Sequence, residues 1–141
     1  MSDVYRKDID DVLLEFSING KAKNEDWAEV DIKITSPVIS YNLRDWEPDG
    51  EIFQLVDIKY VIRLMDRWNN GELTEVEEYE ALEPDLLLKF YPGEEKRIDF
   101  CICLQTTGFA FTENYIIIPL YNKDATDFVD YWKSVEYEFD F

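Results

Sequence analysis

The spacing of hydrophobic residues changes near the middle of the chain, and this change limits the possible folds most strongly. In residues 29–36, Val30, Ile32 and Ile34 alternate with charged residues, which is typical of a half-buried strand. From Glu51 the apolar residues instead recur every three or four positions, as in an amphipathic helix. They are Leu55, Ile58, Val61, Ile62, Met65 and Trp68.

Turn residues bound this helix and separate the other predicted elements. Asp49 is the expected N-cap of the helix, and Asn69-Asn70-Gly71 is expected to end it. Asn19-Gly20 predicts a turn after residues 11–19. Further strands are predicted at 38–43, 74–82, 85–91, 96–105 and 115–120, the last as a buried strand, and a second helix at 123–135, with Phe128, Val129, Trp132 and Val135 facing inward.

Strands outnumber helices and follow one another through short turns. This order predicts an α+β fold with a mainly antiparallel, curved β-sheet and two amphipathic helices, at about 50–69 and 123–135. The 141 residues contain no linker and no internal repeat, so we expect a single domain over 1–141.

The charge of the chain restricts its partners. There are 32 acidic and 14 basic residues, which gives a net charge of −18. Solubility alone requires a net charge of about 2 to 8 in a small domain. Nucleic acids and anionic membranes repel such a chain, so neither is an expected partner. The excess charge has two explanations, adaptation to a salty or acidic host environment and attraction of a cationic protein.

The sequence gives no support for enzymatic chemistry. It has no histidine, which excludes Ser–His–Asp and Cys–His arrangements, and it has no glycine-rich phosphate loop. Residues 45–56 resemble the start of a calcium loop, but Val56 stands where a bidentate Glu is needed. Cys101 and Cys103 are expected to be reduced, half-buried thiols. We therefore expect no catalytic residue, no metal site and no cofactor.

Targeting signals are absent as well. The first residues contain no apolar signal segment, and no apolar run approaches the roughly 20 residues that span a bilayer. These features favour a cytoplasmic protein.

One stretch concentrates negative charge. Residues 71–85 hold seven acids, and no Lys or Arg occurs from Trp68 to Leu88. As a strand, 74–82 has no cleanly apolar face, which indicates an edge strand. Its acids either protect that edge from unwanted pairing or contact a cationic partner. The candidate partner-binding residues are these acids and one loop tryptophan: Glu72, Glu75, Glu77, Glu78, Glu80, Glu83, Asp85 and Trp46.

The order of elements resembles the WapI-type immunity proteins of bacterial polymorphic-toxin systems, which act in contact-dependent inhibition. The resemblance covers roughly residues 29–135, and its most specific element is Leu82-Glu83-Pro84-Asp85-Leu86, where Asp85 takes the position of a more usual Asn. It implies a cytosolic antidote that binds and blocks a toxin domain, often a nuclease. It transfers no toxin-contact residue to this chain.

Two other functions fit the same sequence. One is a small β-rich ligand- or peptide-binding module that uses the loop residues Trp27 and Trp46. The other is a non-catalytic subunit of a larger bacterial assembly. The sequence does not predict an oligomeric state.

Overall fold

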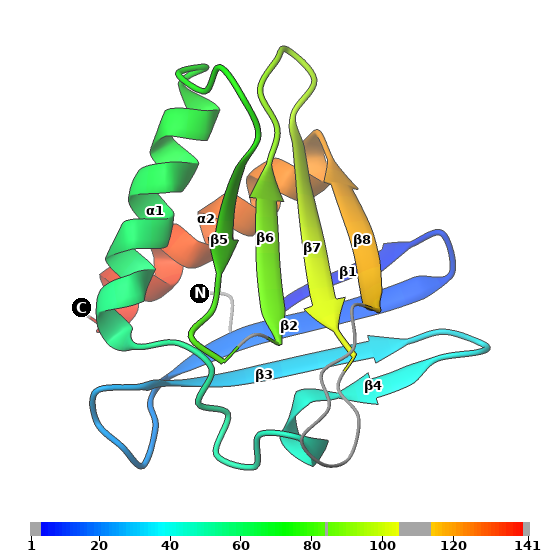
Figure 1. Cartoon of the computed structure of the whole chain (residues 1–141), viewed down its shortest axis with the longest axis vertical. Helices are drawn as coiled ribbons and strands as arrows, with labels where there is room; N and C mark the ends of the chain where they lie inside the picture. The colour runs from blue at the N-terminus through cyan, green and yellow to red at the C-terminus, as the bar shows by residue number, and fades with distance from the viewer. Residues whose placement is uncertain (1–3, 84, 105–113, 140–141) are drawn as a thin grey trace.

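Two antiparallel sheets and two α-helices form the fold (Figure 1). The structure is a computed structural model that describes residues 4–83, 85–104 and 114–139. Each sheet has four strands in sequence order, β1-β2-β3-β4 and β5-β6-β7-β8. The predicted α+β class is confirmed, and the strands divide between two sheets that cross at a steep angle in Figure 1.

The first sheet, called here the N-terminal sheet, is a meander in which each strand pairs antiparallel with the next. Asp10 and Asp11, both with positive φ, join its first two strands. Asn19-Gly20 is not the predicted turn, because the second strand continues to Lys21 and absorbs these residues in a bulge. The elements are β1 (Tyr5–Ile9), β2 (Val12–Lys21), β3 (Ala28–Thr35), β4 (Ser40–Asn42) and the 3-10 helix η1 (Leu43–Asp45).

The second sheet, called here the C-terminal sheet, follows the predicted strands; its first three are shorter than predicted, and its last is one residue longer. Its elements are β5 (Glu77–Glu80), β6 (Leu86–Phe90), β7 (Arg97–Cys103) and β8 (Tyr115–Tyr121). The predicted hairpin between β6 and β7 is confirmed. The prediction of a buried strand at 115–120 is wrong: β8 is an edge strand, and Tyr115 and Ile117 on its outer side are exposed.

Helix α1 (Leu55–Asn69) begins later than its sequence pattern indicates. Asp49 is not its N-cap, because Ile52 and Phe53 are buried in a non-helical segment before the helix. The Phe53 carbonyl accepts a hydrogen bond from the Ala28 amide. Gln54 is the N-cap, and its backbone N–H donates a hydrogen bond to the Asp57 carboxylate at 3.1 Å. The predicted end is confirmed, with Gly71 at φ 73° directly after the helix.

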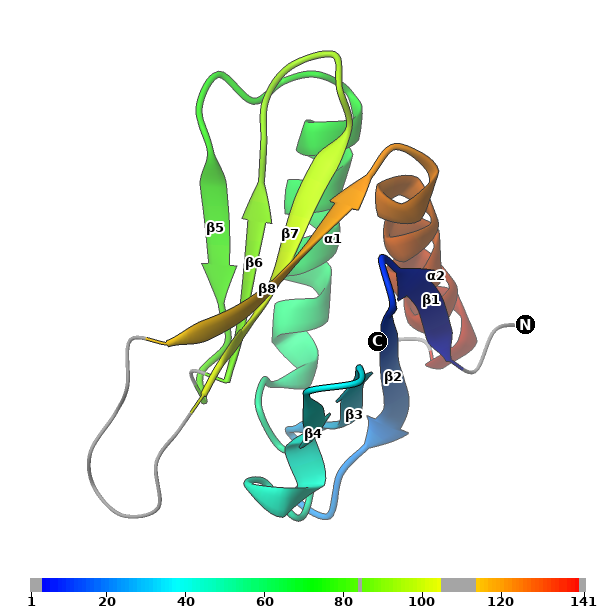
Figure 2. The ribbon, with the colours of Figure 1, turned by 90° about the vertical axis from the view of Figure 1, so that its right-hand side faces the viewer.

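Helix α2 (Lys123–Phe139) closes the core between the two sheets (Figure 2). The four residues predicted to face inward are all buried. On this helix, Phe128 and Trp132 pack against Phe16 of β2, and Phe128 also packs against Phe100 of β7. Because one hydrophobic cluster joins both sheets and both helices, the described residues share a single core.

Candidate functional site

The acidic residues of 71–85 gather at one edge of the C-terminal sheet. β5 pairs only with β6 in this sheet, so the predicted edge position is confirmed. Glu72 and Glu75 lie in the loop that leads into β5, and Glu83 lies in the turn that follows it. We call the exposed members of this set the β5 acidic surface: Glu72, Glu75, Glu78, Glu80 and Glu83.

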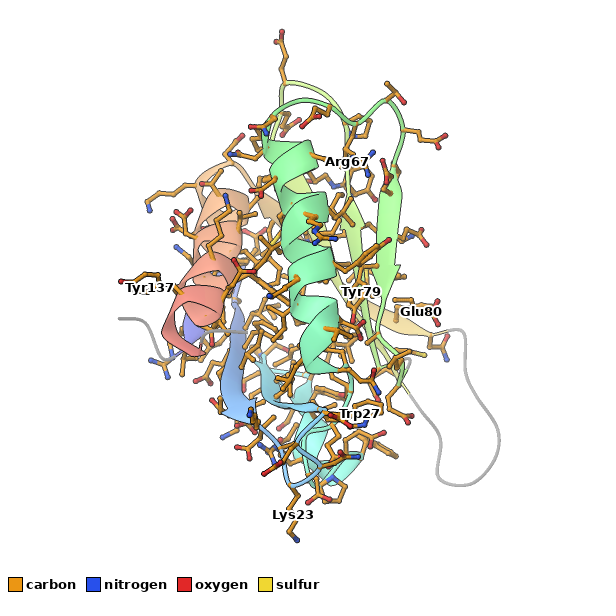
Figure 3. The ribbon with its side chains drawn as sticks, turned by 90° about the vertical axis from the view of Figure 1, so that its left-hand side faces the viewer. Lys23, Trp27, Arg67, Tyr79, Glu80 and Tyr137 are labelled. Carbon is orange, nitrogen blue, oxygen red and sulfur yellow. The ribbon has the colours of Figure 1, made fainter. Side chains whose placement is uncertain are left out.

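Side chains alternate along β5 as the sequence predicts (Figure 3). Tyr79 is buried and its ring lies 6.1 Å from the Tyr60 ring of α1, so this side of the strand faces the helix. Glu80 points away from α1, on the outer face of the sheet. Glu78 stands two positions earlier in β5 and therefore lies on the same face, because strand side chains alternate. This outer face is the side on which a partner can approach.

Two cations that flank the acidic stretch neutralise part of it. Arg67, at the end of α1, holds both carboxylate oxygens of Glu77 at 2.9 and 2.8 Å. Lys89 of β6 lies 3.7 Å from the carboxylate of Glu78. Within the described residues Glu75, Glu80 and Glu83 make no ion pair. The surface therefore keeps a net negative charge, but Glu77 contributes little to it.

Asp85 does not belong to the β5 acidic surface, because only 1% of it is exposed. Its side chain accepts a hydrogen bond from Glu47, which lies in the loop after η1. Burial and the neighbouring carboxylates raise the pKa of Glu47 to about 7 and that of Asp85 to about 6. The two carboxyls thus share a proton near neutral pH and join the η1–α1 loop to the β5–β6 turn.

Backbone contacts hold this junction in place. The amide of Glu83 donates to the carbonyl of Ile52, and the carbonyl of Asp85 accepts from the amide of Cys103. These contacts bring Trp46, the neighbour of Glu47, to the same end of the molecule as the β5–β6 turn. Trp46 is 39% exposed, whereas Trp27 is half-buried and pairs with Gln54 in an isolated bridge.

Apolar side chains that the sequence reading missed lie on the outer face of the C-terminal sheet. On β8, Tyr115, Ile117 and Tyr121 are exposed by 45%, 55% and 41%. Across the sheet, Val76 and Leu82 flank β5 and are also exposed. The run YIIIPLY gives no local signal for this, because an unbroken apolar run is equally typical of a buried strand.

The two cysteines are free thiols, as expected, but both are buried and not half-buried. Burial raises the pKa of Cys101 to about 11, which leaves it protonated and unreactive at neutral pH. Within the described ranges, no three acidic, cysteine or histidine side chains form a group that could hold a metal ion. None of the described helices has the length and apolar character to cross a membrane.

Comparisons with protein-family models, with curated proteins and with solved structures found no match to this chain. The resemblance to WapI-type immunity proteins therefore remains a hypothesis that rests on the quoted residues.

Proposed function

We propose that this protein is an acidic immunity protein that binds a cationic toxin domain, expected to be a nuclease, and blocks it by steric and electrostatic occlusion. The observation that carries the proposal is the β5 acidic surface. Its carboxylates are concentrated on one sheet edge, and among the residues that the structure describes no cation pairs with Glu75, Glu80 or Glu83. A net charge of −18 strengthens the attraction at longer range.

The acidity of the surface suits the proposed target. A nuclease must hold phosphates, so its substrate-binding face carries Lys and Arg side chains. An inhibitor that places carboxylates against this face competes with the nucleic acid for the same cations. No group of the inhibitor needs to take part in a reaction.

Affinity requires more than charge, because exposed ion pairs contribute only about 0–1 kcal/mol each. The outer face of the C-terminal sheet supplies apolar contacts next to the acids. Tyrosines are frequent hot spots in interfaces, and Tyr115 and Tyr121 are both exposed there. We therefore assign the partner contact to this outer face together with the β5 acidic surface.

A salt-stepped capture tests the function. The immobilised protein receives a lysate of its source organism at low salt, and bound proteins are eluted by increasing the salt concentration. We expect a basic protein that stays bound above physiological ionic strength, where diffuse attraction is screened beyond about 8 Å. We also expect its enzymatic activity to be lost when one equivalent of this protein is added.

Three results would contradict the proposal in different ways. Generic cationic proteins that all elute at modest salt would assign the charge to solvation. A tightly bound partner that keeps its full activity would favour a subunit of an assembly. Binding that does not depend on the salt concentration but is lost in Trp46→Ala would favour a ligand-binding module.

A further inference from the structure

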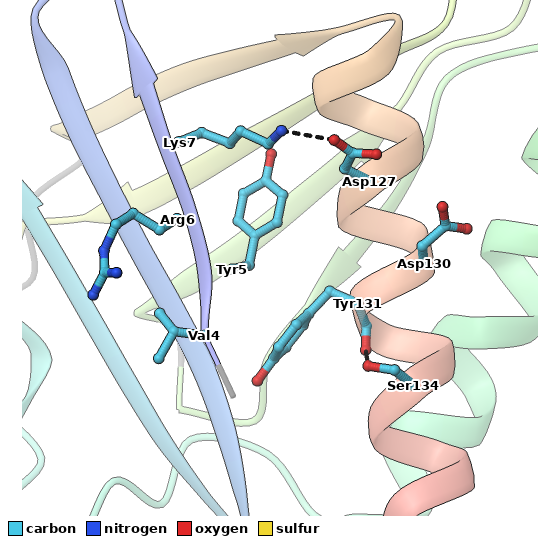
Figure 4. A pocket seen from close by; sticks show the side chains of 8 residues that line it. All are labelled: Val4, Tyr5, Arg6, Lys7, Asp127, Asp130, Tyr131 and Ser134. Carbon is cyan, nitrogen blue, oxygen red and sulfur yellow. Dashed lines mark hydrogen bonds and ion pairs between the residues drawn. The ribbon is translucent and has the colours of Figure 1, made fainter. Parts of the chain in front are cut away.

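A groove runs between the first strand and the last helix (Figure 4). Both elements lie on the opposite side of the fold from β5 (Figure 2). The volume of the groove is about 430 Å³, within the range of about 300–1,000 Å³ that ligand sites occupy. Residues 4–7 line it from the β1 side, and Asp127, Asp130, Tyr131 and Ser134 line it from α2. No residue of the β5 acidic surface lines this groove.

The groove follows the free edge of β1. Side chains of alternating strand residues point to opposite faces of a sheet, and here Tyr5 packs into the core against Phe128 while Arg6 forms an exposed pair with Glu15. A cavity that touches side chains of both faces must pass along the edge of the strand. β1 is an edge strand, because it pairs only with β2 in this sheet.

Within the described part of the chain, some backbone groups of β1 have no hydrogen-bond partner and point outward from this edge. The two-residue Asp10-Asp11 turn makes Ile9 and Val12 a hydrogen-bonded pair, and such pairs recur at every second residue. The N–H and C=O groups of Lys7 therefore face β2, whereas those of Arg6 and Asp8 face away from it. An extended segment that lies in the groove can bond to Arg6 and Asp8 and continue the sheet.

The other three edges of the described sheets are less suited to an added strand. β4 has three residues and β5 has four. β8 has seven, but Pro119 stands opposite Asp99 with its backbone facing outward and offers no N–H donor there. β1 has five residues and no proline. Of the edge strands in the described residues, β1 is the one that forms a groove with α2.

The charges around the groove select the occupant. Arg6 is bound to Glu15 at 2.9 Å, and Lys7 is bound to Asp127 at 2.6 Å, so both cations of the groove are already paired. Within the described residues the exposed carboxylates of Asp8 and Asp130 make no ion pair. The unsatisfied charge at this edge is negative.

We propose that the β1 edge is a docking site for an extended, basic segment of a partner protein, which adds as a fifth strand to the N-terminal sheet. Backbone hydrogen bonds to Arg6 and Asp8 hold the segment, and Asp130 receives one of its Lys or Arg side chains. This site is separate from the β5 acidic surface. The docking site is tested with a synthetic peptide and not with the captured partner. A negative peptide result would therefore refute this site and leave the proposed function untouched.

The probe is the peptide Ac-Lys-Val-Lys-Val-Lys-NH2, titrated into the intact protein while backbone amide NMR signals are followed. We expect the amides of Arg6 and Asp8 to shift and saturate with a Kd on the order of 1 mM, since a short flexible peptide loses much of its binding energy to ordering. The matched control, Ac-Glu-Val-Glu-Val-Glu-NH2, should bind at least about tenfold more weakly.

Two substitutions at one position separate the backbone contact from the side chain. Arg6→Pro removes the outward N–H, and Arg6→Thr removes the same guanidinium but keeps that N–H. We expect Arg6→Pro to bind the lysine peptide about fivefold more weakly than Arg6→Thr, the loss of one hydrogen bond. If Arg6→Pro does not fold, Asp8→Pro and Asp8→Asn form the replacement pair. Asp130→Asn should weaken binding about twofold.

Several results would overturn the proposal. A lysine peptide that leaves the β1 amides unchanged and shifts only those of Glu78 and Glu80 would make β5 the docking edge. Equal affinity for the two peptides would remove the charge selection. Equal affinity of the Pro and Thr variants would remove the added strand.

Discussion

The Glu47–Asp85 pair makes the stability of this protein depend on pH in an unusual direction. Both pKa values are raised above their ordinary values, to about 7 and about 6, so the folded state binds protons more tightly than the unfolded chain does. The stabilisation is complete below the ordinary pKa values, near pH 4, and is lost as the pH rises through 6 and 7. Asp85→Asn removes the contribution of Asp85 to this dependence and weakens that of Glu47, because an amide carries no charge and can donate to the Glu47 carboxylate.

The magnitude follows from the two shifts. A raised pKa of about two units corresponds to about 3 kcal/mol at 1.36 kcal/mol per unit. The two shifts do not add, because the pair titrates as one coupled site. Glu47 is only half-buried, so solvent screening reduces its share further. We expect this pair to lower the free energy of unfolding by about 1–3 kcal/mol as the pH rises from 5 to 8.

Urea unfolding at pH 5, 6, 7 and 8 measures this effect. With an m value of about 2 kcal/mol/M, the wild-type midpoint should fall by roughly 1 M over this range relative to Asp85→Asn. Self-repulsion of the −18 charge also weakens the fold as the pH rises. Glu95→Gln, which removes one exposed charge, is the matched control. If Asp85→Asn and Glu95→Gln show the same pH dependence, the Glu47–Asp85 pair does not share a proton.

Three further variants test the fold by denaturant unfolding. Gly50→Ala should lower the free energy of unfolding by about 2–4 kcal/mol. Gly50 has φ 69°, and an added Cβ would lie 2.5 Å from the Val30 carbonyl oxygen. A loss below about 1 kcal/mol would show that this position is not strained. Phe16→Ala should cost about 3–5 kcal/mol, since Phe16 joins β2 to β7 and α2 in the core, and a cost typical of a surface site would refute that role. Asp10→Asn with Asp11→Gly should stabilise by about 0.5–1 kcal/mol, because both residues have positive φ, and a loss of stability would exclude the inferred turn.

Elements with a one-sided burial pattern could be predicted from the sequence. β3 and both helices each bury a single face, so their apolar residues keep a regular spacing that is visible locally. β1 has no such pattern in YRKDI. It is a strand because Tyr5 packs against Phe128 and Tyr131 of α2, at the other end of the chain. The bulge at Asn19-Gly20 likewise depends on pairing with β3, which overrides the local turn preference.

The candidate site was predictable only in part. The acidic edge of β5 follows from alternation within 74–82, which the sequence displays directly. The burial of Asp85 does not, because its partner Glu47 is distant in sequence and reaches it only through the folded η1–α1 loop. The sequence also does not show that two cations just outside the acidic stretch pair with it. These are Arg67 of α1, which binds Glu77, and Lys89 of β6, which lies near Glu78.

The most direct test of the proposed binding surface is the association rate of the captured cationic partner with two charge variants. One carries Gln at four positions of the β5 acidic surface: Glu75, Glu78, Glu80 and Glu83. The other loses four exposed carboxylates in loops of the N-terminal sheet: Asp10→Asn, Asp11→Asn, Glu25→Gln and Asp26→Asn. Both lose four negative charges, so their overall charge is the same.

If the β5 acidic surface contacts the partner, the first variant should associate about tenfold more slowly than the wild type at low salt, and the control should change about twofold or less. The difference should shrink as salt is added. Equal rates for the two variants would show that only the total charge matters, and the β5 acidic surface would not be the binding site.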